Sequence, residues 1–200
     1  AGEKGHSLTW MDAVVFGRPA APRIGYPVEI NALWYKAIMF TLELARANND
    51  NKFVKEWEPI AMRASESFKE AFWYEKKQYL ADYVDDQGQE IAVRPNQIFA
   101  ASLPYSPITD DMKVGVIDIV ERELLTPKGL RTLAPKNPLY HGKYEGDQST
   151  RDSAYHQGTV WPWLMGHFVE AYYKLHGKRA NAVAKNFLSA IEEDMCKYGI

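Results

Sequence analysis

The stretch VEINALWYKAIMFTLELARANN, which runs from Val28 to Asn49, decides the fold because it is apolar on most sides of a helix. Pro27 suits the first position of such a helix, and Asn48 to Asp50 ends it. The following segment, Lys52 to Phe72, carries one apolar stripe with charge elsewhere. We expect it to form an outer, half-solvated helix that is kinked or restarted at Pro59. A mostly buried helix followed by an amphipathic one is the pattern of a layered helical toroid.

The same alternation recurs twice along the chain. Ile98 to Leu103 predicts a short apolar helix, and Thr109 to about Leu125 predicts an amphipathic one. Thr159 to Leu175 is mostly apolar, and Lys178 to Tyr198 carries a single apolar stripe. The sequence therefore predicts an all-α fold of about six helices in inner–outer pairs, with a small hairpin on the rim near Tyr79 to Glu90. Inner helices of a complete ring are buried on both sides, so we expect this chain to expose a large apolar surface.

The segment Gly129 to Trp163 is a long, non-periodic run rich in Gly, Pro, Arg, acidic and aromatic residues. Disorder is one interpretation, but the Tyr and Trp content favours an ordered loop that faces a ligand. Thr159 can cap the next helix, and Pro162 would fall in its first turn. The loop would thereby bring His156 and Trp161 to the mouth of that helix.

Composition is that of a globular chain, with 200 residues, 46% hydrophobic residues and a formal net charge of −2. Nothing in it indicates a nucleic acid or a membrane as partner, and no apolar run approaches the roughly 20 residues of a spanning helix. The single cysteine, Cys196, fits a reducing compartment, so we expect a cytoplasmic location. The sequence begins at Ala1 rather than with Met, which suggests a piece of a longer polypeptide.

The residue types favour carbohydrate chemistry over metal or phosphate chemistry. The five histidines show no metal-ligand spacing, and no glycine-rich phosphate loop is present, so we expect neither a metal nor a cofactor. Carboxylates with aromatic rings, amides and arginines are what a glycosidase uses. Asp12 beside Trp10 fits a general acid whose pKa is raised by an apolar neighbour, although a helix cap or a solvated turn fits equally. Glu29 and Asn31 would face a polar cavity or bond one another, or Glu29 would merely complement the helix dipole.

Several segments together resemble one family. They are LTWMDA (8–13), PVEINALWYKA (27–37), RPNQIFAASLPY (94–105), GLRTLAP (129–135) and YHGKYEGDQSTRDSAYHQGTVWPW (140–163). The chain resembles the C-terminal glucosidase domain of glycogen debranching enzymes, which is similar to the other (α/α)6-toroid glycosidases. The resemblance implies that residues 1–200 are part of a single (α/α)6 domain, about half of the ring, with the remainder or a further domain in the same polypeptide.

The resemblance also implies an activity. It implies an inverting amylo-α-1,6-glucosidase that acts on branch stubs of glycogen or branched α-glucan oligosaccharides, without a cofactor. Asp12 falls where the family has its general acid. The segments that line the family's sugar pocket supply ten binding candidates: Trp10, Glu29, Asn31, Arg94, Asn96, Arg131, His141, Asp152, His156 and Trp161.

The general base expected for this family has no counterpart among these segments. The resemblance puts it on a glutamate after the last helix pair, beyond Ile200, so we expect residues 1–200 alone to be inactive. Glu145 is the fallback within the chain, although Lys143 or Arg151 nearby would equally make it an ion-pair partner. Two other functions stay open: another α-glucosidase of the same toroid class, glucoamylase-like or trehalase-like, and a non-catalytic carbohydrate-binding helical scaffold.

Overall fold

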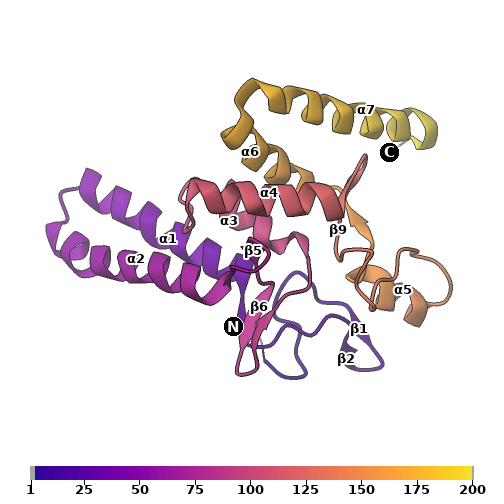
Figure 1. The fold of residues 1–200 in the computed structure, drawn as a ribbon, viewed down its shortest axis with the longest axis horizontal. Helices are drawn as coiled ribbons and strands as arrows, with labels where there is room; N and C mark the ends of the chain where they lie inside the picture. The colour runs from indigo at the N-terminus through magenta and orange to yellow at the C-terminus, as the bar shows by residue number, and fades with distance from the viewer. Residues whose placement is uncertain (1–2, 200) are drawn as a thin grey trace.

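The computed structural model describes residues 3–199, and within them the fold is all-α, as the sequence predicts (Figure 1). Ala1, Gly2 and Ile200, which carry the expectations about the ends of the chain, lie outside the described residues. The helices are α1 (Val28–Ala47), α2 (Asn51–Phe72), η1 (Pro95–Gln97), α3 (Ile98–Ser102), α4 (Asp110–Leu124), α5 (Gln148–Tyr155), α6 (Leu164–His176), η2 (Gly177–Arg179) and α7 (Ala180–Tyr198). Within residues 3–199, no helix combines the length and the apolarity needed to cross a membrane.

Helices α1 and α2 form an antiparallel pair that projects to one side of the molecule (Figure 1). The Asp50 carboxylate accepts the Phe53 N–H at 3.1 Å and so caps α2. The expected restart at Pro59 is wrong, because α2 is continuous from Asn51 to Phe72, and the alternative of a kink there stays a prediction. Pro59 lies on the exposed side of the helix, where water can satisfy the carbonyl that loses its N–H partner.

Helix α1 is less buried than its composition predicts. Ile38 and Leu42 pack against Ala61 of α2, but Trp34 is 56% exposed and Phe40 is 50% exposed. Burial on most sides, which the sequence predicts for a complete ring, is therefore not reached within the described residues. The exposed apolar face agrees instead with the expectation that an inner helix of a ring needs further packing partners.

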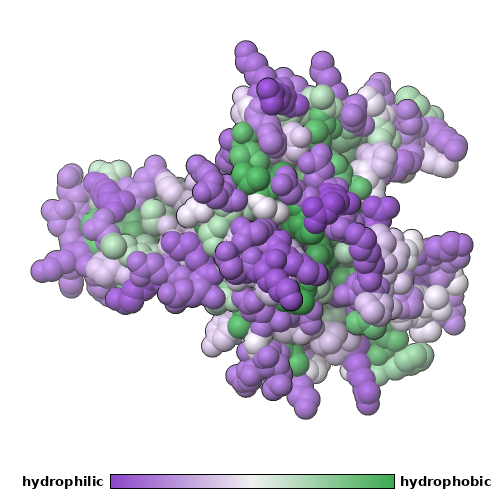
Figure 2. All heavy atoms as spheres, in the orientation of Figure 1, coloured by the Kyte–Doolittle hydropathy of each residue, from purple (hydrophilic) through white to green (hydrophobic). Residues whose placement is uncertain are grey.

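The three helix pairs expected from the sequence are present. Helix α1 contacts α2 and α3, α3 contacts α4 and α6, and α6 contacts α7. The largest buried cluster lies where α3, α4 and α6 meet and includes Ile98, Val120 and Phe168. Figure 2 shows that the projecting parts are covered mainly by hydrophilic residues, with hydrophobic residues visible between them. Closure of the pairs into a ring stays a prediction.

Short antiparallel strands connect the helices at one end of the pairs. Strands β3 (Tyr26–Pro27), β6 (Tyr83–Asp85) and β7 (Gly88–Glu90) form one sheet, and the β6–β7 hairpin confirms the turn expected there. The other sheets join β1 (Val14–Val15) to β2 (Arg18–Pro19), β4 (Trp73–Tyr74) to β5 (Tyr79–Leu80), and β8 (Leu125–Thr126) through β9 (Gly129–Arg131) to β10 (Val160–Trp161).

The segment 129–163 is ordered but is not simply a loop. It contains α5, which begins where the Asp147 carboxylate accepts the Thr150 N–H at 2.8 Å. The expected helix start at Thr159 is wrong, because Val160 pairs with Arg131 in the β9–β10 ladder and α6 begins only at Leu164. This ladder fixes both ends of the segment to the body of the protein.

Candidate active site

The segment that carries Asp12 is anchored by a buried amide. The Trp10 indole N–H donates to Asn96 Oδ1 at 2.7 Å, and Asn96 Nδ2 donates to Asp82 Oδ1 at 2.7 Å. Asn96 belongs to η1, directly before α3, and its side chain is fully buried. Met11 packs beside it with 1% exposure. The backbone that leads into Asp12 is therefore set by these contacts rather than by solvent.

Beneath this amide lies a buried ion-pair network. The Arg23 guanidinium donates to both Glu29 carboxylate oxygens, at 2.5 and 2.6 Å, and its Nε donates to Asp82 Oδ2 at 2.7 Å. Burial by itself would lower the pKa of Arg23, but the carboxylates of Asp82 and Glu29 outweigh it and raise the pKa above its ordinary value. Glu29 therefore binds Arg23 at the junction of β3 and α1, and it does not face a polar cavity.

Arg94 binds the segment 129–163 through buried hydrogen bonds. Its guanidinium donates to the backbone carbonyls of Thr132 and His156, at 3.0 and 2.7 Å, and to Gln157 Oε1 at 2.7 Å. The Arg94 side chain is 9% exposed. All of these contacts are internal, so Arg94 positions residues 132 and 156–157 and does not present its donors to solvent.

His156 links the long segment to Asp12. Its Nε2 accepts the Asp12 backbone N–H at 3.1 Å, and the same nitrogen lies 3.5 Å from Asp12 Oδ1. The His156 side chain is 1% exposed, whereas that of Asp12 is 68% exposed. Burial lowers the pKa of His156 to about 4, against the opposing influence of the Asp12 carboxylate. The imidazole is therefore neutral near pH 7.

Three tryptophans surround this point. The Trp10 ring lies edge-on to Trp161 at a centroid distance of 6.1 Å and to Trp163 at 5.1 Å. Trp161 is held by its own indole N–H, which donates to the Tyr155 carbonyl at 3.0 Å. Trp163 remains 44% exposed. The apolar C–H faces of a sugar can stack on an exposed ring of this kind.

The expectation for the neighbours of Asp12 is only partly met. We expected Asp12 beside Trp10, within reach of Glu29 or of residues 141–145, and shielded by apolar surroundings. Its polar partner is His156, both Glu29 oxygens are bonded to Arg23, and its carboxylate faces solvent. Glu29 does not contact Asp12 because the Arg23 guanidinium binds both of its carboxylate oxygens, and Arg23 belongs to no motif in the sequence.

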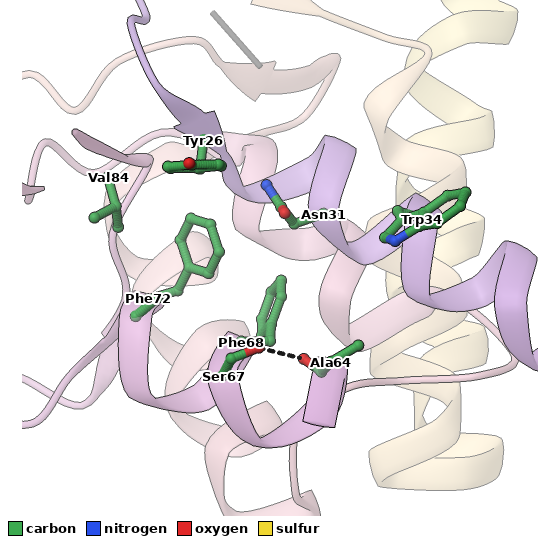
Figure 3. Close-up of a pocket in the computed structure, with 9 residues that line it drawn as sticks. Tyr26, Asn31, Trp34, Ala64, Ser67, Phe68, Phe72 and Val84 are labelled. Atoms are coloured by element: carbon green, nitrogen blue, oxygen red, sulfur yellow. Dashed lines mark hydrogen bonds between the residues drawn. The ribbon is translucent and has the colours of Figure 1, made fainter. Parts of the chain in front are cut away.

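The remaining candidates do not gather at Asp12. The Asn31 amide donates to the Pro27 carbonyl at 2.8 Å and lines a hollow of about 440 Å³ between α1 and α2. Figure 3 shows Asn31 on α1 between Tyr26 and Trp34, with Phe68 of α2 among the other residues that line the hollow. Asp12 does not line this hollow.

The candidates on the long segment make local contacts. The Arg131 guanidinium donates to the Leu125 carbonyl at 3.3 Å, and Asp152 Oδ1 accepts from Gln148 Nε2 at 2.8 Å. His141 is exposed, and its backbone N–H donates to the Gln157 carbonyl at 2.6 Å. Glu145 is 70% exposed and lies 3.5 Å from Lys143, the ion-pair role that the sequence left open for it.

Comparison with known proteins decides the family. A family model described as amylo-alpha-1,6-glucosidase matches residues 1–199. The chain belongs to the amylo-alpha-1,6-glucosidase family. The glycogen debranching enzyme of Saccharomyces cerevisiae is 27% identical over an alignment that covers 85% of this chain and 14% of that protein. The chain thus spans about one seventh of the length of this curated relative, and its family is one of glycosidases.

Sequence reasoning missed two residues of the buried network in this member of the family. Arg23 follows Pro22 in a segment interpreted as loop, and nothing in its neighbourhood predicts burial. Asp82 precedes Tyr83 in the predicted hairpin, where an acidic residue is ordinarily solvated, yet it is 2% exposed. Their unpaired burial would be costly, so each is explained by its buried partners: Glu29 and Asp82 for Arg23, and Arg23 and Asn96 for Asp82.

Proposed function

We propose that this chain contributes the general-acid half of an inverting glucosidase that removes α-1,6-linked glucose from branch stubs of glycogen or related α-glucans. The observation that carries the proposal is the exposure of Asp12, whose side chain is 68% exposed. The backbone that carries it is held by the Trp10–Asn96 hydrogen bond and by the hydrogen bond from the Asp12 N–H to His156. Membership of the amylo-alpha-1,6-glucosidase family supplies the reaction class.

In the proposed reaction, Asp12 starts as the carboxylic acid. Its proton passes to the glycosidic oxygen as the bond from that oxygen to the anomeric carbon breaks, and the bonding electron pair leaves with the oxygen. A water molecule attacks the anomeric carbon from the opposite face and loses a proton to a second carboxylate, which gives β-glucose. Trp163, with its partly exposed ring beside Trp10, offers a face on which a glucose ring can stack.

The second carboxylate is proposed to come from a glutamate that follows residue 200 in a longer polypeptide. Glu145 is the weaker candidate, because it is exposed and 3.5 Å from Lys143. In this proposal residues 1–200 belong to a single (α/α)6 domain whose other helices cover the exposed apolar face of α1, and the enzyme works in the cytoplasm on a soluble α-glucan. A purified 1–200 chain would then be inactive.

A substrate panel tests the reaction class in the intact enzyme. Release of glucose is measured from a limit dextrin with single α-1,6-linked glucose stubs, from maltose and from trehalose. We expect kcat/KM to be highest for the branched stub. Preference for maltose or trehalose would favour a glucoamylase-like or trehalase-like enzyme, and binding without any turnover would favour a carbohydrate-binding scaffold.

Replacement of the candidate acid tests its role. Asp12→Asn keeps the shape and removes the transferable proton, so we expect kcat on the branched stub to fall by about 10²–10⁴. Asp118→Asn is the matched control, because Asp118 is an exposed aspartate on α4. Near-normal turnover by the Asp12 variant would move the acid to another residue.

A further inference from the structure

We propose that His156 is a positioning residue for Asp12: its buried Nε2 accepts the Asp12 backbone N–H and thereby fixes where the acidic carboxyl group stands. This inference rests on the proposed function, in which Asp12 is the general acid. It replaces the sequence-based expectation that His156 contacts the sugar. A side chain that is 1% exposed cannot reach a substrate without a rearrangement.

The hydrogen bond determines the tautomer of the imidazole. Because Nε2 accepts the Asp12 N–H at 3.1 Å, the proton of the neutral ring must reside on Nδ1. Nδ1 is buried and has no hydrogen-bond partner among the described residues. The ring therefore leaves a donor unsatisfied while its accepting nitrogen faces Asp12. A buried polar atom left without a partner is costly, which points to a constraint on this residue other than stability.

The surroundings of the ring prevent it from turning away. Trp10 lies edge-on at a centroid distance of 5.2 Å, and Trp161 is stacked at 5.9 Å with an interplanar angle of 18°. Arg94 holds the backbone at the same residue by donating to the His156 carbonyl at 2.7 Å. The position of Nε2 is thus set by the aromatic cluster and by the buried guanidinium together.

Burial, rather than the charges that face the ring, favours the accepting state. Arg94 and Arg23 disfavour the imidazolium, and the Asp12 carboxylate, 3.5 Å from Nε2, favours it. Burial is the largest influence and also disfavours the charged form. An imidazolium would turn Nε2–H toward the Asp12 N–H, and two donors would then face one another. During turnover His156 neither gives nor takes a proton, which passes directly from Asp12 to the glycosidic oxygen.

Two substitutions separate the accepting atom from the bulk of the ring. In His156→Gln the side-chain oxygen can reach the place of Nε2 and accept the Asp12 N–H. In His156→Asn the shorter amide reaches only the place of Nδ1 and leaves that N–H unpaired. Both variants are made in the intact enzyme and compared with Asp12→Asn.

Two substrates separate the acid from binding. The branched α-1,6 stub needs a proton on its leaving oxygen, whereas the fluoride of α-glucosyl fluoride departs without one. We expect His156→Asn to lower kcat on the branched stub by about 10–100-fold, the effect of a small misplacement, with KM and the fluoride rate changed by less than about 3-fold. His156→Gln should retain most of the activity on both substrates.

Several outcomes would overturn the inference. A raised KM with unchanged kcat would make His156 a sugar contact, and equal losses on both substrates in both variants would make it a structural residue only. If Asp12→Asn keeps normal kcat on the branched stub, the acid assignment itself fails, and this inference fails with it. Loss in Asp12→Asn with a normal His156→Asn would remove the positioning role alone.

A second measurement does not depend on the variants folding. Nitrogen-15 spectra of histidine in the wild-type enzyme report which ring nitrogen carries the proton. We expect His156 to be protonated at Nδ1 and to accept at Nε2 between pH 6 and 8. The opposite tautomer would contradict the geometry on which the proposal stands.

Discussion

Trp10 and Asn96, 86 positions apart in the sequence, are joined by a hydrogen bond of 2.7 Å from the indole nitrogen to the amide oxygen. The bond ties the segment that carries Asp12 to η1, directly before α3, and Asn96 is fully buried. The position of the candidate acid therefore depends on a contact that does not involve the acid.

Loss of this bond should be measurable as lost stability. Trp10→Phe keeps an aromatic ring but leaves Asn96 Oδ1 without its donor, so we expect the free energy of unfolding to fall by about 1–3 kcal/mol. Trp73→Phe is the control, because the Trp73 indole donates to the exposed Glu75 carboxylate, which water can satisfy. Urea unfolding of the intact domain gives the free energy of unfolding of both variants. Equal losses of stability would refute the larger contribution assigned to the Trp10–Asn96 hydrogen bond.

The buried ion pairs predict a ranking of substitutions. Arg23→Met leaves Glu29 and Asp82 buried without their main partner and should cost about 3–5 kcal/mol. Glu29→Gln should cost less, because Arg23 keeps Asp82. Arg46→Met, which removes the exposed pair with Glu58, should cost less than about 1 kcal/mol. Thermal unfolding gives the order, and a reversed order would contradict the network described above.

His156 predicts a pH dependence of stability. Its pKa in the folded protein is about 4 against 6.5 for the unfolded chain, so the unfolded chain binds more protons between these values. Stability contributed by the neutral ring is present above pH 6.5 and is lost as the pH falls to about 4, by about 3 kcal/mol in total.

The measurement compares wild type with His156→Gln by urea unfolding from pH 7 to pH 4. The wild type should lose the additional stability over this range, and the variant should not. His141→Gln is the control, because His141 is exposed, and it should follow the wild type. If stability changes with pH in the same way in the wild type and the His156 variant, burial of this ring does not couple its protonation to stability.

Gly158 and Gly166 should respond to alanine in opposite ways. At Gly158, φ is +145° and an added Cβ would lie 2.5 Å from the His141 carbonyl oxygen, so Gly158→Ala should destabilise by more than about 1 kcal/mol. Gly166 lies in α6 with open space around it, so Gly166→Ala should stabilise by about 0.5 kcal/mol. Unfolding midpoints of the two variants test both signs, and a stable Gly158 variant would contradict the close approach of residues 141 and 158.

Helix pairs were predictable because the spacing of apolar residues shows where a helix forms and which of its faces can be buried. The alternation of the α1 and α2 segments, and the Thr109 cap of α4, were readable from residue types and spacing. The restart expected at Pro59 and the cap expected at Thr159 failed for different physical reasons. Pro59 is tolerated on an exposed face of α2, and Thr159 is drawn into the β9–β10 ladder rather than capping α6.

The sequence predicts which segments carry the site residues, but it does not predict which side chains contact one another. Trp10, Asn96 and His156 converge near Asp12, whereas Arg131, Asp152 and Glu145 have local partners. Arg23 and Asp82 carry no local signal, because a buried ion pair is visible only when both members are brought together.

The anomeric form of the first glucose released tests the central claim most directly. Proton NMR is recorded during the first turnovers of the intact enzyme on a branched stub, before mutarotation mixes the anomers. Attack by water on the face opposite to an Asp12-protonated leaving group gives β-glucose first, and we expect that signal to appear before the α-anomer. Initial α-glucose would contradict the inverting mechanism and the role assigned to Asp12 within it.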